Sequence, residues 1–567
     1  MSLPASFSKN VEKKREKVFV EEDTSPSYSD LEIAEAKDTN DSKTRISKFL
    51  KGLELKTSNN SRGSNVDLDP VVLSKRTWKS HNFAMYWISD DFSLSMFESA
   101  SSLMEVGLSW KLAIGCVTLA QFITSLPIVA NGLVGSNYRI GFAIQSRAAF
   151  GWHFSKLIIL MRMIVSIFWY AIQSYNGASC IYAMTVAIWP SFKTLHNQLP
   201  EDSDTSTQMM ICFFIYFVVV LPFFYIPMSL LRHFFTLKSI VTPIVGFGIM
   251  GWCIQEVKNK GLYHELWSDD TNTATGSERS WLFLSGIYSN IGTWATMGVN
   301  SPDFTRYAKS NSSQYITILT MPCMACLMTF LGVVTAKASQ VIYGTMLWSP
   351  MELVNNWTSS GGRAAAFFCG VAWLIAQIGV NIAGNSVAAA NDMNALWPRY
   401  INIRRGQIIT AVIGSYALVP WKIMKSGASF LSFMSGYTIW LGPITGILIS
   451  DFFFIHKMRY NIWELYNPSG IYRYGKLGIN WPAFVAFNVG WVPLLPGLLP
   501  SVNSKYVMPA GINHLYALGY FYGVLATSAV YVGLWKLFPN KQALIDKAVY
   551  CDDIDYDPFP TDYDPMT

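Results

Sequence analysis

The stretch HNFAMYWISDDFSLSMFESASSLMEVG, residues 81–107, is long and apolar enough to cross a bilayer, yet it carries Asp90 and Asp91 near its middle. A carboxylate in the hydrocarbon core costs roughly 3 kcal/mol on insertion scales, so such residues usually mark an ion or substrate pathway. About eleven further apolar segments of similar length follow, as expected for a polytopic membrane protein. We therefore predict that the first span lines a transport site.

The composition excludes an ordinary soluble protein. The chain has 567 residues, of which 51% are hydrophobic and only 14% are charged. We predict an all-α fold of about 12 transmembrane helices, and no catalytic triad, phosphate loop or metal-ligand cluster indicates an enzyme. The predicted spans are 81–107, 112–134, 157–189, 209–230, 234–255, 281–302, 314–337, 364–391, 407–423, 429–455, 481–500 and 513–537.

The net charge of +6 is explained by topology and does not indicate a nucleic-acid partner. Lys and Arg gather in alternate loops, which predicts that these loops and both termini face the cytosol. The intervening loops carry acidic residues instead. The basic loop residues are Arg139, Arg147, Lys156, Arg306, Lys309, Arg399, Arg404, Arg405, Lys457, Arg459, Arg473 and Lys476.

Polar segments flank the predicted transporter domain, 79–540. Residues 1–78 mix charges with Ser and contain few aromatic residues, so we predict a disordered cytosolic arm. Residues 541–567 form an acidic cytosolic tail. Ubiquitin attachment or trafficking machinery could act on these segments, although a merely solvated tail would have the same composition.

The first and sixth spans differ from the others in their small and polar residues. The sixth contains Ser289-Asn290-Ile291-Gly292-Thr293 and ends in Asn300-Ser301-Pro302-Asp303. Five spans separate the two starting points, so the two spans run in opposite directions. Polar, Gly and Pro residues at matching positions in inverted halves indicate broken helices beside a midplane binding site.

Three spans carry side chains suited to a flat heterocycle. Trp169 and Gln173 are four residues apart and share a helical face, as do Asn381 and Asn385. Trp294 follows the predicted break and offers a second aromatic surface, next to Thr293. A lipid-facing Trp169, or amides that only join neighbouring helices, would explain the same residues without a binding site.

Four longer runs carry a family resemblance. Over roughly residues 65–500, these runs resemble the nucleobase-cation-symport-1 family, specifically its fungal uracil, uridine and allantoin permeases. The last run is the most specific. The runs are GLSW at 107–110, WYAIQ at 169–173, NSPDFTRY at 300–307, and NDMNAL at 391–396 leading to YINIRRG at 400–406.

The resemblance implies a LeuT-like fold of two inverted five-helix repeats plus two extra helices, with import by alternating access. It also implies that substrate stacks between Trp169 and Trp294 and hydrogen-bonds Gln173 and Asn385. All four residue types are present. Asn381, with Thr293 beside Trp294, completes the predicted substrate-binding set.

One difference from a related transporter bears on which ion is co-transported with the substrate. The similar bacterial hydantoin transporter binds sodium through adjacent Ser and Thr hydroxyls, where this chain has Gly379 and Val380. Sodium needs oxygen ligands, so we expect a co-transported proton and no bound cofactor or metal. The proton-coupling candidates are Asp90, Asp91 and Glu98, and the gating candidates Asp303 and Arg306 close the sixth span, where they could form an ion pair.

We therefore expect a plasma-membrane proton symporter that imports uracil, uridine or allantoin. Trp294 stands where some fungal uracil permeases have Phe, and Val380 replaces a commoner Thr, so the substrate stays open. One alternative is a thiamine or nicotinamide riboside transporter of the same family. Another is a nutrient receptor with vestigial transport.

Overall fold

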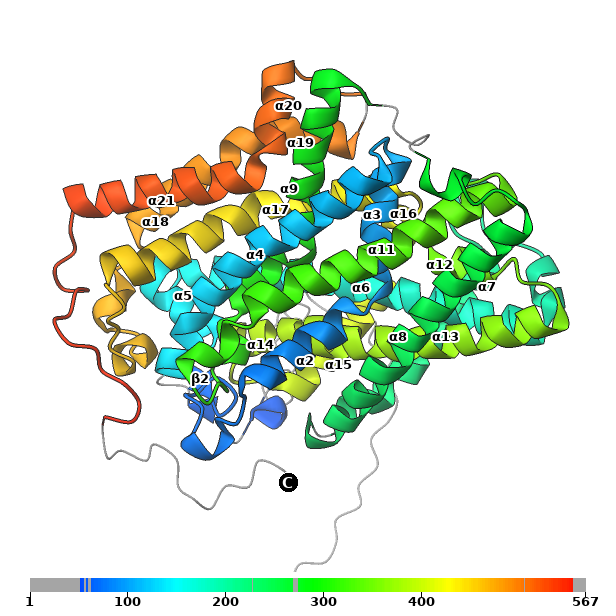
Figure 1. Ribbon diagram of the computed structural model, residues 1–567. Coiled ribbons are helices and arrows are strands. Elements are labelled where there is room, and N and C mark those ends of the chain that lie inside the picture. Colours follow the sequence, from blue (N-terminus) through cyan, green and yellow to red (C-terminus); the bar gives the residue numbers. More distant parts are fainter. Residues whose placement is uncertain are drawn as a thin grey trace, which may run out of the picture. The chain divides into compact units, whose positions relative to one another are not determined.

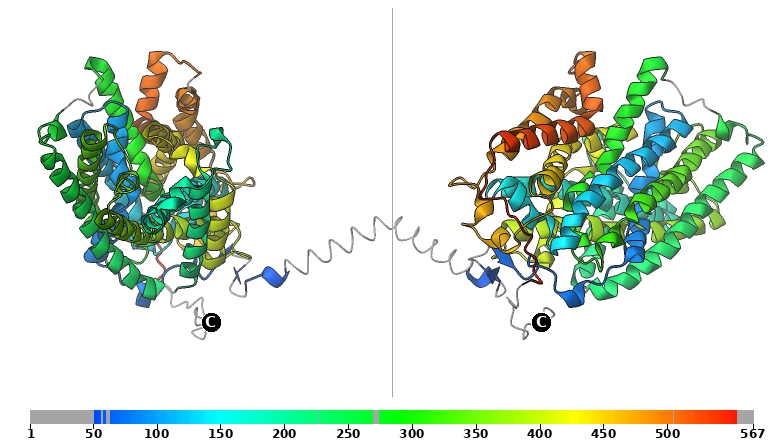
Figure 2. Two further views of the ribbon diagram at one scale, coloured as in Figure 1. Left: turned by 90° about the vertical axis from the view of Figure 1, so that its right-hand side faces the viewer. Right: turned by 60° about the vertical axis from the view of Figure 1, so that its left-hand side comes forward.

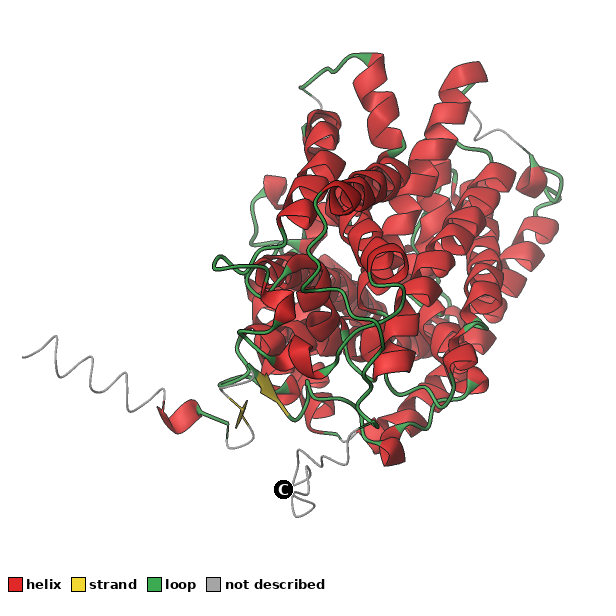
Figure 3. Ribbon diagram, turned by 90° about the vertical axis from the view of Figure 1, so that its left-hand side faces the viewer, coloured by secondary structure: helices red, strands yellow, loops and turns green. Residues whose placement is uncertain are grey.

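A computed structural model describes most of the chain as helices joined by loops (Figure 3). Contacts divide the chain into two units, Met1–Glu54 and Leu55–Thr567. In the first unit, residues 51–53 form a helical turn. The second unit holds the transporter helices. The described residues are 51–55, 58–59, 63–226, 228–268, 274–503 and 505–553, so most of the predicted arm and the end of the predicted tail lie outside them.

The helices follow the predicted spans (Figure 1). The first ten spans comprise α2 (Ser80–Asp91), α3 (Leu94–Glu105), α4 (Trp110–Tyr138), α5 (Phe142–Phe150), α6 (Phe154–Ile188), α7 (Thr207–Val220), α8 (Met228–Asn259), α9 (Gly276–Asn300), α10 (Pro302–Thr305), α11 (Thr317–Tyr343), α12 (Pro350–Val354), α13 (Ser360–Val380), the π-helix η7 (Asn381–Ser386), α14 (Val387–Leu396), α15 (Ile403–Tyr416), α16 (Pro420–Ile423), α17 (Gly427–Ser450) and the π-helix η8 (Asp451–Ile455). The last part comprises α18 (Trp481–Trp491), α19 (Leu495–Val502), α20 (Ala510–Ala517) and α21 (Gly519–Leu537).

Short elements complete the described structure. Two-residue strands pair antiparallel at the edge of the second unit, and 3-10 turns join several helices. These elements are β1 (Ser58–Asn59), β2 (Ser64–Asn65), η1 (Leu73–Lys75), η2 (Pro190–Thr194), η3 (Glu201–Ser203), η4 (Leu221–Tyr225), η5 (Glu265–Trp267), η6 (Asn311–Gln314), η9 (Trp463–Tyr466), η10 (Ile471–Arg473) and η11 (Val492–Leu494).

Eight helical segments among the described residues are long and apolar enough to span a membrane, and the pair α20–α21, bent by 78°, forms a ninth. The three other predicted spans correspond to α2 with α3, to α9, and to α15 with α16, which are shorter or more polar. The all-α polytopic prediction is therefore confirmed, with three spans that hydropathy alone does not mark strongly.

The spans differ in how much protein surrounds them. In the most apolar windows of α6 and α17, 72% of residues are buried, against 33% in the segment containing α7 and 28% in α8. Figures 1 and 2 show α17 beside α4 and α21, and α17 also contacts α9. A helix buried on all sides cannot face lipid, so its polar side chains must meet other protein groups or a ligand.

The predicted break in the first span is present. α2 ends at Asp91, and α3 begins at Leu94. Between them, Ser93 has an extended backbone, and its hydroxyl accepts a hydrogen bond from the Met96 N–H. Ser is a preferred N-cap because it satisfies an otherwise free amide at the start of a helix. The two aspartates therefore lie at the end of α2, next to non-helical backbone.

The predicted break at Gly292 in the sixth span is wrong. α9 continues through Gly292 to Asn300, and the helix ends only where α10 begins. A Cβ at Gly292 would lie 2.7 Å from the Met434 carbonyl oxygen of α17. The missing side chain thus lets two helices approach closely and does not unwind either of them.

The two ends of the bundle are distinguished by their loops. We call the end carrying residues 63–79, 301–316 and 538–553 the tail side, and the end carrying loops 189–206 and 344–359 the far side. On the tail side, the 63–78 segment packs against the bundle: Leu68 and Val71 are buried, and Asn65 donates to Asn394. The predicted arm therefore does not include residues 63–78.

Candidate functional site

Trp169 of α6 faces the protein interior. Its side chain is buried, and its indole N–H donates to the Tyr437 hydroxyl at 2.9 Å. That hydroxyl donates in turn to the Gly292 carbonyl at 2.5 Å. The lipid-facing alternative for Trp169 is therefore wrong. One chain of hydrogen bonds joins α6, α17 and α9 at the level of the predicted aromatic pair.

Trp294 of α9 contacts the acidic end of α2. Its indole N–H donates to Asp91 Oδ1 at 2.9 Å, and its ring meets Trp87 edge-on at a centroid distance of 5.2 Å. Both Trp294 and the neighbouring Thr293 are at most 9% exposed. The Thr293 hydroxyl lies 3.4 Å from the sulfur of Met434. Trp294 therefore connects the predicted substrate aromatics to the predicted ion-coupling carboxylates.

Gln173 is paired with an amide from α13. Its Oε1 accepts a hydrogen bond from Gln377 Nε2 at 2.9 Å, and both side chains are buried. This contact agrees with the helix-joining alternative for Gln173. One accepted bond leaves the second lone pair of that oxygen available to a ligand. Gln377 was not among the predicted site residues.

Asn381 and Asn385 lie in η7 and face the same way, as their spacing predicted. Asn385 Nδ2 donates to Asn381 Oδ1 at 3.2 Å. Asn381 is fully buried, and its Nδ2 contacts the Tyr170 carbonyl and the hydroxyls of Ser174 and Tyr216. These contacts commit Asn381 to protein partners, so we expect it to position Asn385 rather than to bind substrate.

A lysine missed by the sequence analysis faces the predicted coupling carboxylates. Lys238 of α8 is buried, and its Nζ lies 3.7 Å from Asp90 Oδ1. Neither Lys238 Nζ nor the second oxygens of Asp90 and Asp91 make a hydrogen bond within the described part of the chain. Lys238 lies near the predicted start of a span, which is also where a snorkelling lysine is expected.

Lys238 also explains why residue 379 is glycine. A Cβ on Gly379 would lie only 2.9 Å from Lys238 Cδ. On the other side of Asp90, a Cβ on Gly384 would lie 4.0 Å from Asp90 Oδ2. The stem of Lys238 thus runs beside Gly379, and the Asp90 carboxylate faces Gly384 of η7.

These contacts connect all four predicted ligand side chains through neighbouring residues. Trp169 donates a hydrogen bond to Tyr437, which donates in turn to the main chain of α9. Trp294 donates a hydrogen bond to Asp91 of α2. Asn385 donates a hydrogen bond to Asn381, which donates to Ser174 of α6, and Gln173 lies on that same helix. The four side chains are between 4% and 8% exposed. The geometry agrees with a shared site enclosed by α2, α6, α9, η7 and α17.

Comparisons with known proteins identify the family. Residues 70–523 match the family described as permease for cytosine/purines, uracil, thiamine, allantoin. The chain belongs to the nucleobase-cation-symport-1 permeases. It is similar to an uncharacterized permease of Schizosaccharomyces pombe, with 42% identity over 90% of this chain and 89% of the relative. It is also 32% identical to the uridine permease of Saccharomyces cerevisiae, over 84% of this chain and 75% of that protein.

A solved structure supports the fold of the permease. The nucleobase-cation-symport-1 transporter with bromovinylhydantoin bound, in a closed conformation, has a TM-score of 0.66 to this chain and 18% identity. The match covers 84% of this chain and 97% of the solved chain. The LeuT-like architecture is therefore confirmed. The family match, and not this likeness, shows that the chain is a multi-pass membrane transporter and not an enzyme.

Glu98 lies apart from the other two proton-coupling candidates of the permease. It belongs to α3, beyond the break, and is 1% exposed. It lines a far-side cavity together with Asn176, whose Nδ2 is 3.5 Å from Glu98 Oε2. Asp90 and Asp91 instead face Lys238 and Trp294. The structure therefore separates the three carboxylates into two groups.

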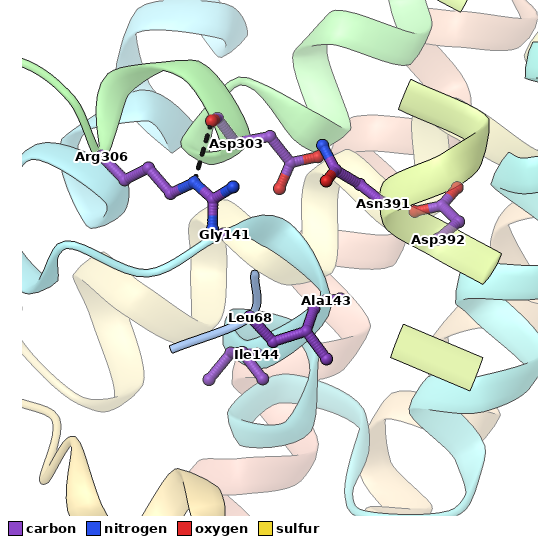
Figure 4. Close-up of a pocket in the computed structure, with 8 residues that line it drawn as sticks. All are labelled: Leu68, Gly141, Ala143, Ile144, Asp303, Arg306, Asn391 and Asp392. Atoms are coloured by element: carbon purple, nitrogen blue, oxygen red, sulfur yellow. Dashed lines mark hydrogen bonds between the residues drawn. The ribbon is translucent and has the colours of Figure 1, made fainter. Parts of the chain in front are cut away.

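Asp303 and Arg306 do not form the predicted side-chain ion pair. Arg306 Nε donates to the main-chain oxygen of Asp303 at 3.1 Å, as Figure 4 shows. The Asp303 carboxylate accepts from the Phe142 N–H at 2.9 Å, and Arg306 Nη1 donates to the Asp67 carbonyl. Both side chains line a small tail-side pocket with Asn391 and other residues. They join α10 to the 63–78 segment and α5, where gating stays a prediction.

Proposed function

We propose that this permease imports a uracil-like base, its riboside or a related ureide such as allantoin by proton symport. The observation that carries the proposal is the buried group of Asp90, Asp91 and Lys238, which contacts Trp294. Trp169 and Trp294 stack the heterocycle, and Gln173 and Asn385 hydrogen-bond it. Amides left unpaired by a ligand without matching groups penalise that ligand and give specificity.

Charge balance supports proton coupling. Two carboxylates face one ammonium, and the charge of Lys238 acts on both Asp90 and Asp91. If all three side chains are ionised, one uncompensated negative charge lies buried, which is costly in a low-dielectric interior. Binding of one proton removes that charge. A sodium ion would need oxygen ligands that Gly379 and Val380 do not supply.

The contact between Asp91 and Trp294 supports coupling of the proton to substrate. An ionised Asp91 accepts a charge-assisted hydrogen bond from the indole, and a protonated Asp91 accepts a weaker one. The charge of this carboxylate therefore biases the position of a substrate-stacking ring. In each transport cycle the far-side-open protein takes up a proton and the heterocycle, closes, and releases both on the tail side.

The orientation follows from charge and stays part of the proposal. The basic loops 139–156 and 456–480 belong to the tail side, which we assign to the cytosol by the positive-inside rule. We place the protein in the plasma membrane, with the far side outside. The tails carry Lys and Ser residues on which ubiquitin or trafficking machinery would act.

Uptake measurements test the proposal. Cells that lack their own permeases would be given labelled uracil, uridine, allantoin, thiamine and nicotinamide riboside at two external pH values. We expect one of the first three to accumulate against its gradient, faster at the lower pH. Substrate binding without accumulation would instead indicate a receptor, and accumulation of thiamine or nicotinamide riboside alone would indicate a vitamin carrier.

Variants test the site within the same assay. We expect Asn385→Ala to abolish uptake while the protein still reaches the cell surface. The matched control is Asn259→Ala, which removes an exposed amide at the far-side end of α8 and should transport normally. Unchanged uptake by Asn385→Ala would refute the assigned site.

A further inference from the structure

We propose that the far-side cavity is a binding site for an organic cation, separate from the central heterocycle site. The cavity has a volume of about 370 Å³ and lies between α3, α6, α7 and α12. Sites for small organic ligands typically measure about 300–1,000 Å³. We call this cavity the vestibule. The inference goes beyond the proposed function, because it assigns a second ligand class to a second place.

The charge of the vestibule wall points to a cation. Glu98 and Glu352 line it, whereas none of the described residues that line it is Lys, Arg or His. Glu98 is almost completely buried, and among the described residues its carboxylate has a long contact from Asn176 and a contact with the hydroxyl of Ser349. A buried carboxylate with few donors carries a large desolvation cost, which a bound positive charge offsets.

Aromatic side chains in the vestibule wall fit the same ligand class. Tyr175, Tyr182 and Trp348 line the vestibule. A cation over an aromatic face is attracted electrostatically by the ring, and more strongly where water is excluded. Carboxylate and aromatic groups together favour a flat or quaternary cation over a strongly hydrated metal ion. The ligand is therefore expected to carry its charge on a ring or on a substituted amine.

Two polar atoms in the vestibule wall lack partners. Asn355 Oδ1 and Thr205 Oγ1 are shielded from solvent and make no hydrogen bond within the described residues. Both residues line the cavity. Buried polar atoms without partners are rare, so they indicate where ligand N–H groups or bound water would sit. These acceptors add hydrogen-bond directionality to the charge provided by Glu98.

The vestibule lies on the route from the far side to the central site. Asn176, at its wall, is three residues from Gln173 on α6, so the two amides lie about one helical turn apart. Basic residues near the mouth have other partners: Lys193 donates to the Asn355 carbonyl, and Lys425 pairs with Asp204. A bound cation would therefore meet little repulsion and would obstruct access to Gln173.

Direct binding tests the proposal independently of transport. The probes are 1-methylnicotinamide and nicotinamide, which share a ring and an amide but differ in a methyl group and a positive charge. Binding to the purified full-length protein would be followed by calorimetry. We expect the cation to bind at least about ten-fold more tightly than the neutral compound, since only the cation gains the carboxylate and cation–π interactions. Equal affinities would overturn the proposal, as would the absence of binding at millimolar concentration.

Three variants locate the bound cation. Glu98→Gln keeps the side-chain shape and removes the charge, and we expect it to weaken binding of 1-methylnicotinamide about ten-fold. Glu278→Gln, which changes an exposed carboxylate outside the vestibule, should bind normally. Asn385→Ala should also bind normally, because it alters only the central site. Equal losses in Glu98→Gln and Glu278→Gln would overturn the assignment, provided that both elute as monodisperse protein. Loss of binding in Asn385→Ala would likewise overturn it.

An uptake measurement distinguishes a cation that is transported from one that only blocks the entrance. Labelled 1-methylnicotinamide that accumulates in cells through the wild type, but not through Glu98→Gln, would show the vestibule to be an entry site for cationic cargo. Binding without accumulation, together with slower uptake of the neutral substrate, would show a site for a blocking ligand. Both results support the cation site. They leave the proton-symport proposal to its own experiment, so that failure of one proposal is distinguishable from failure of the other.

Discussion

Two of the ion pairs buried among the described helices of this permease differ in how tightly the protein holds them. Arg162 of α6 pairs with Asp392 of α14, and its guanidinium also donates to the Ala388 carbonyl at 2.6 Å. Asn300, with its amide oriented to suit both neighbours, accepts from the same guanidinium at 2.8 Å. Lys238 and Asp90 are 3.7 Å apart and lack such supporting bonds within the described residues.

The difference separates a structural pair from a functional one. A charged group tied by several hydrogen bonds is stabilised in one state, so its protonation is hard to change. A loosely paired carboxylate next to another carboxylate, as Asp90 is next to Asp91, binds a proton more readily. We therefore infer that Arg162–Asp392 fixes α6 to α14, while Asp90–Lys238 takes part in the cycle.

Arg162→Ala should have the largest effect on stability. It leaves the Asp392 carboxylate buried without its cation, which typically costs about 3–5 kcal/mol. We expect little folded protein at the cell surface and a strongly lowered Tm, measured by size-exclusion chromatography after heating. The double variant Arg162→Met with Asp392→Leu should recover folding, because it removes both charges. A single variant as stable as the wild type would contradict the structural role.

Lys238→Met should abolish concentrative uptake yet leave the fold largely intact. Loss of the ammonium leaves Asp90 and Asp91 without a cation, and their protonation can relieve the resulting charge. We therefore expect at least about a ten-fold loss of accumulation at neutral pH with a much smaller change in Tm than in Arg162→Ala. Radiolabel uptake and surface biotinylation measure the two effects. A collapse of Tm equal to that of Arg162→Ala would remove the distinction between the two pairs.

Gly379→Ser should have an intermediate effect. The new Cβ would meet the Lys238 stem at 2.9 Å, so the lysine must shift away from Asp90. We expect a several-fold slower uptake with protein still folded. Gly248→Ser, at a position on α8 with no heavy atom within 4 Å of an added Cβ, is the matched control. Wild-type kinetics in Gly379→Ser would show that the position of Lys238 is not critical.

The pair of Arg76 and Asp552, in which only the aspartate side chain is exposed, should have the smallest effect. The hydrogen bond from Arg76 lowers the pKa of Asp552 below its ordinary value. The pair therefore stabilises the fold above about pH 4, and this contribution is lost as the pH falls further. Because the Asp552 side chain is 62% exposed, we expect Asp552→Asn to cost less than about 0.5 kcal/mol at neutral pH and still less in high salt. A larger, salt-independent loss of Tm would show that the tail contributes more than this pair.

Local patterns in the sequence predicted the helical membrane fold, while substrate binding by the candidate site residues stays a prediction. Hydropathy found the spans, and the i, i+4 spacing of Asn381 and Asn385 predicted their shared face. The break between α2 and α3 was predicted from the polar residues around Asp90 and Asp91, whereas the capping role of Ser93 appears only in the structure. The role of Gly292 was ambiguous in the sequence, because a glycine allows either unwinding of a helix or close packing of two helices. Only the contact of Gly292 with α17 shows that packing is its role.

Long-range partners could not be predicted in the same way. Lys238 lies more than a hundred residues from Asp90 and Gly379, and no local spacing relates it to either. Its residue type did carry a signal, since a lysine next to an apolar run is either an interfacial anchor or a buried charge. The vestibule likewise depends on residues from four helices and three loops. Such sites depend on how distant helices pack.

Proton flux during substrate uptake tests the central claim most directly. The purified protein, reconstituted in liposomes containing a pH-sensitive dye, would be given the substrate identified by the uptake panel. We predict that wild-type protein acidifies the lumen as substrate enters, without any requirement for sodium, and that Asp90→Asn and Lys238→Met lose substrate-dependent acidification. Substrate-driven proton entry that is unchanged in both variants, or uptake that requires sodium, would contradict the assignment of this buried pair to proton coupling.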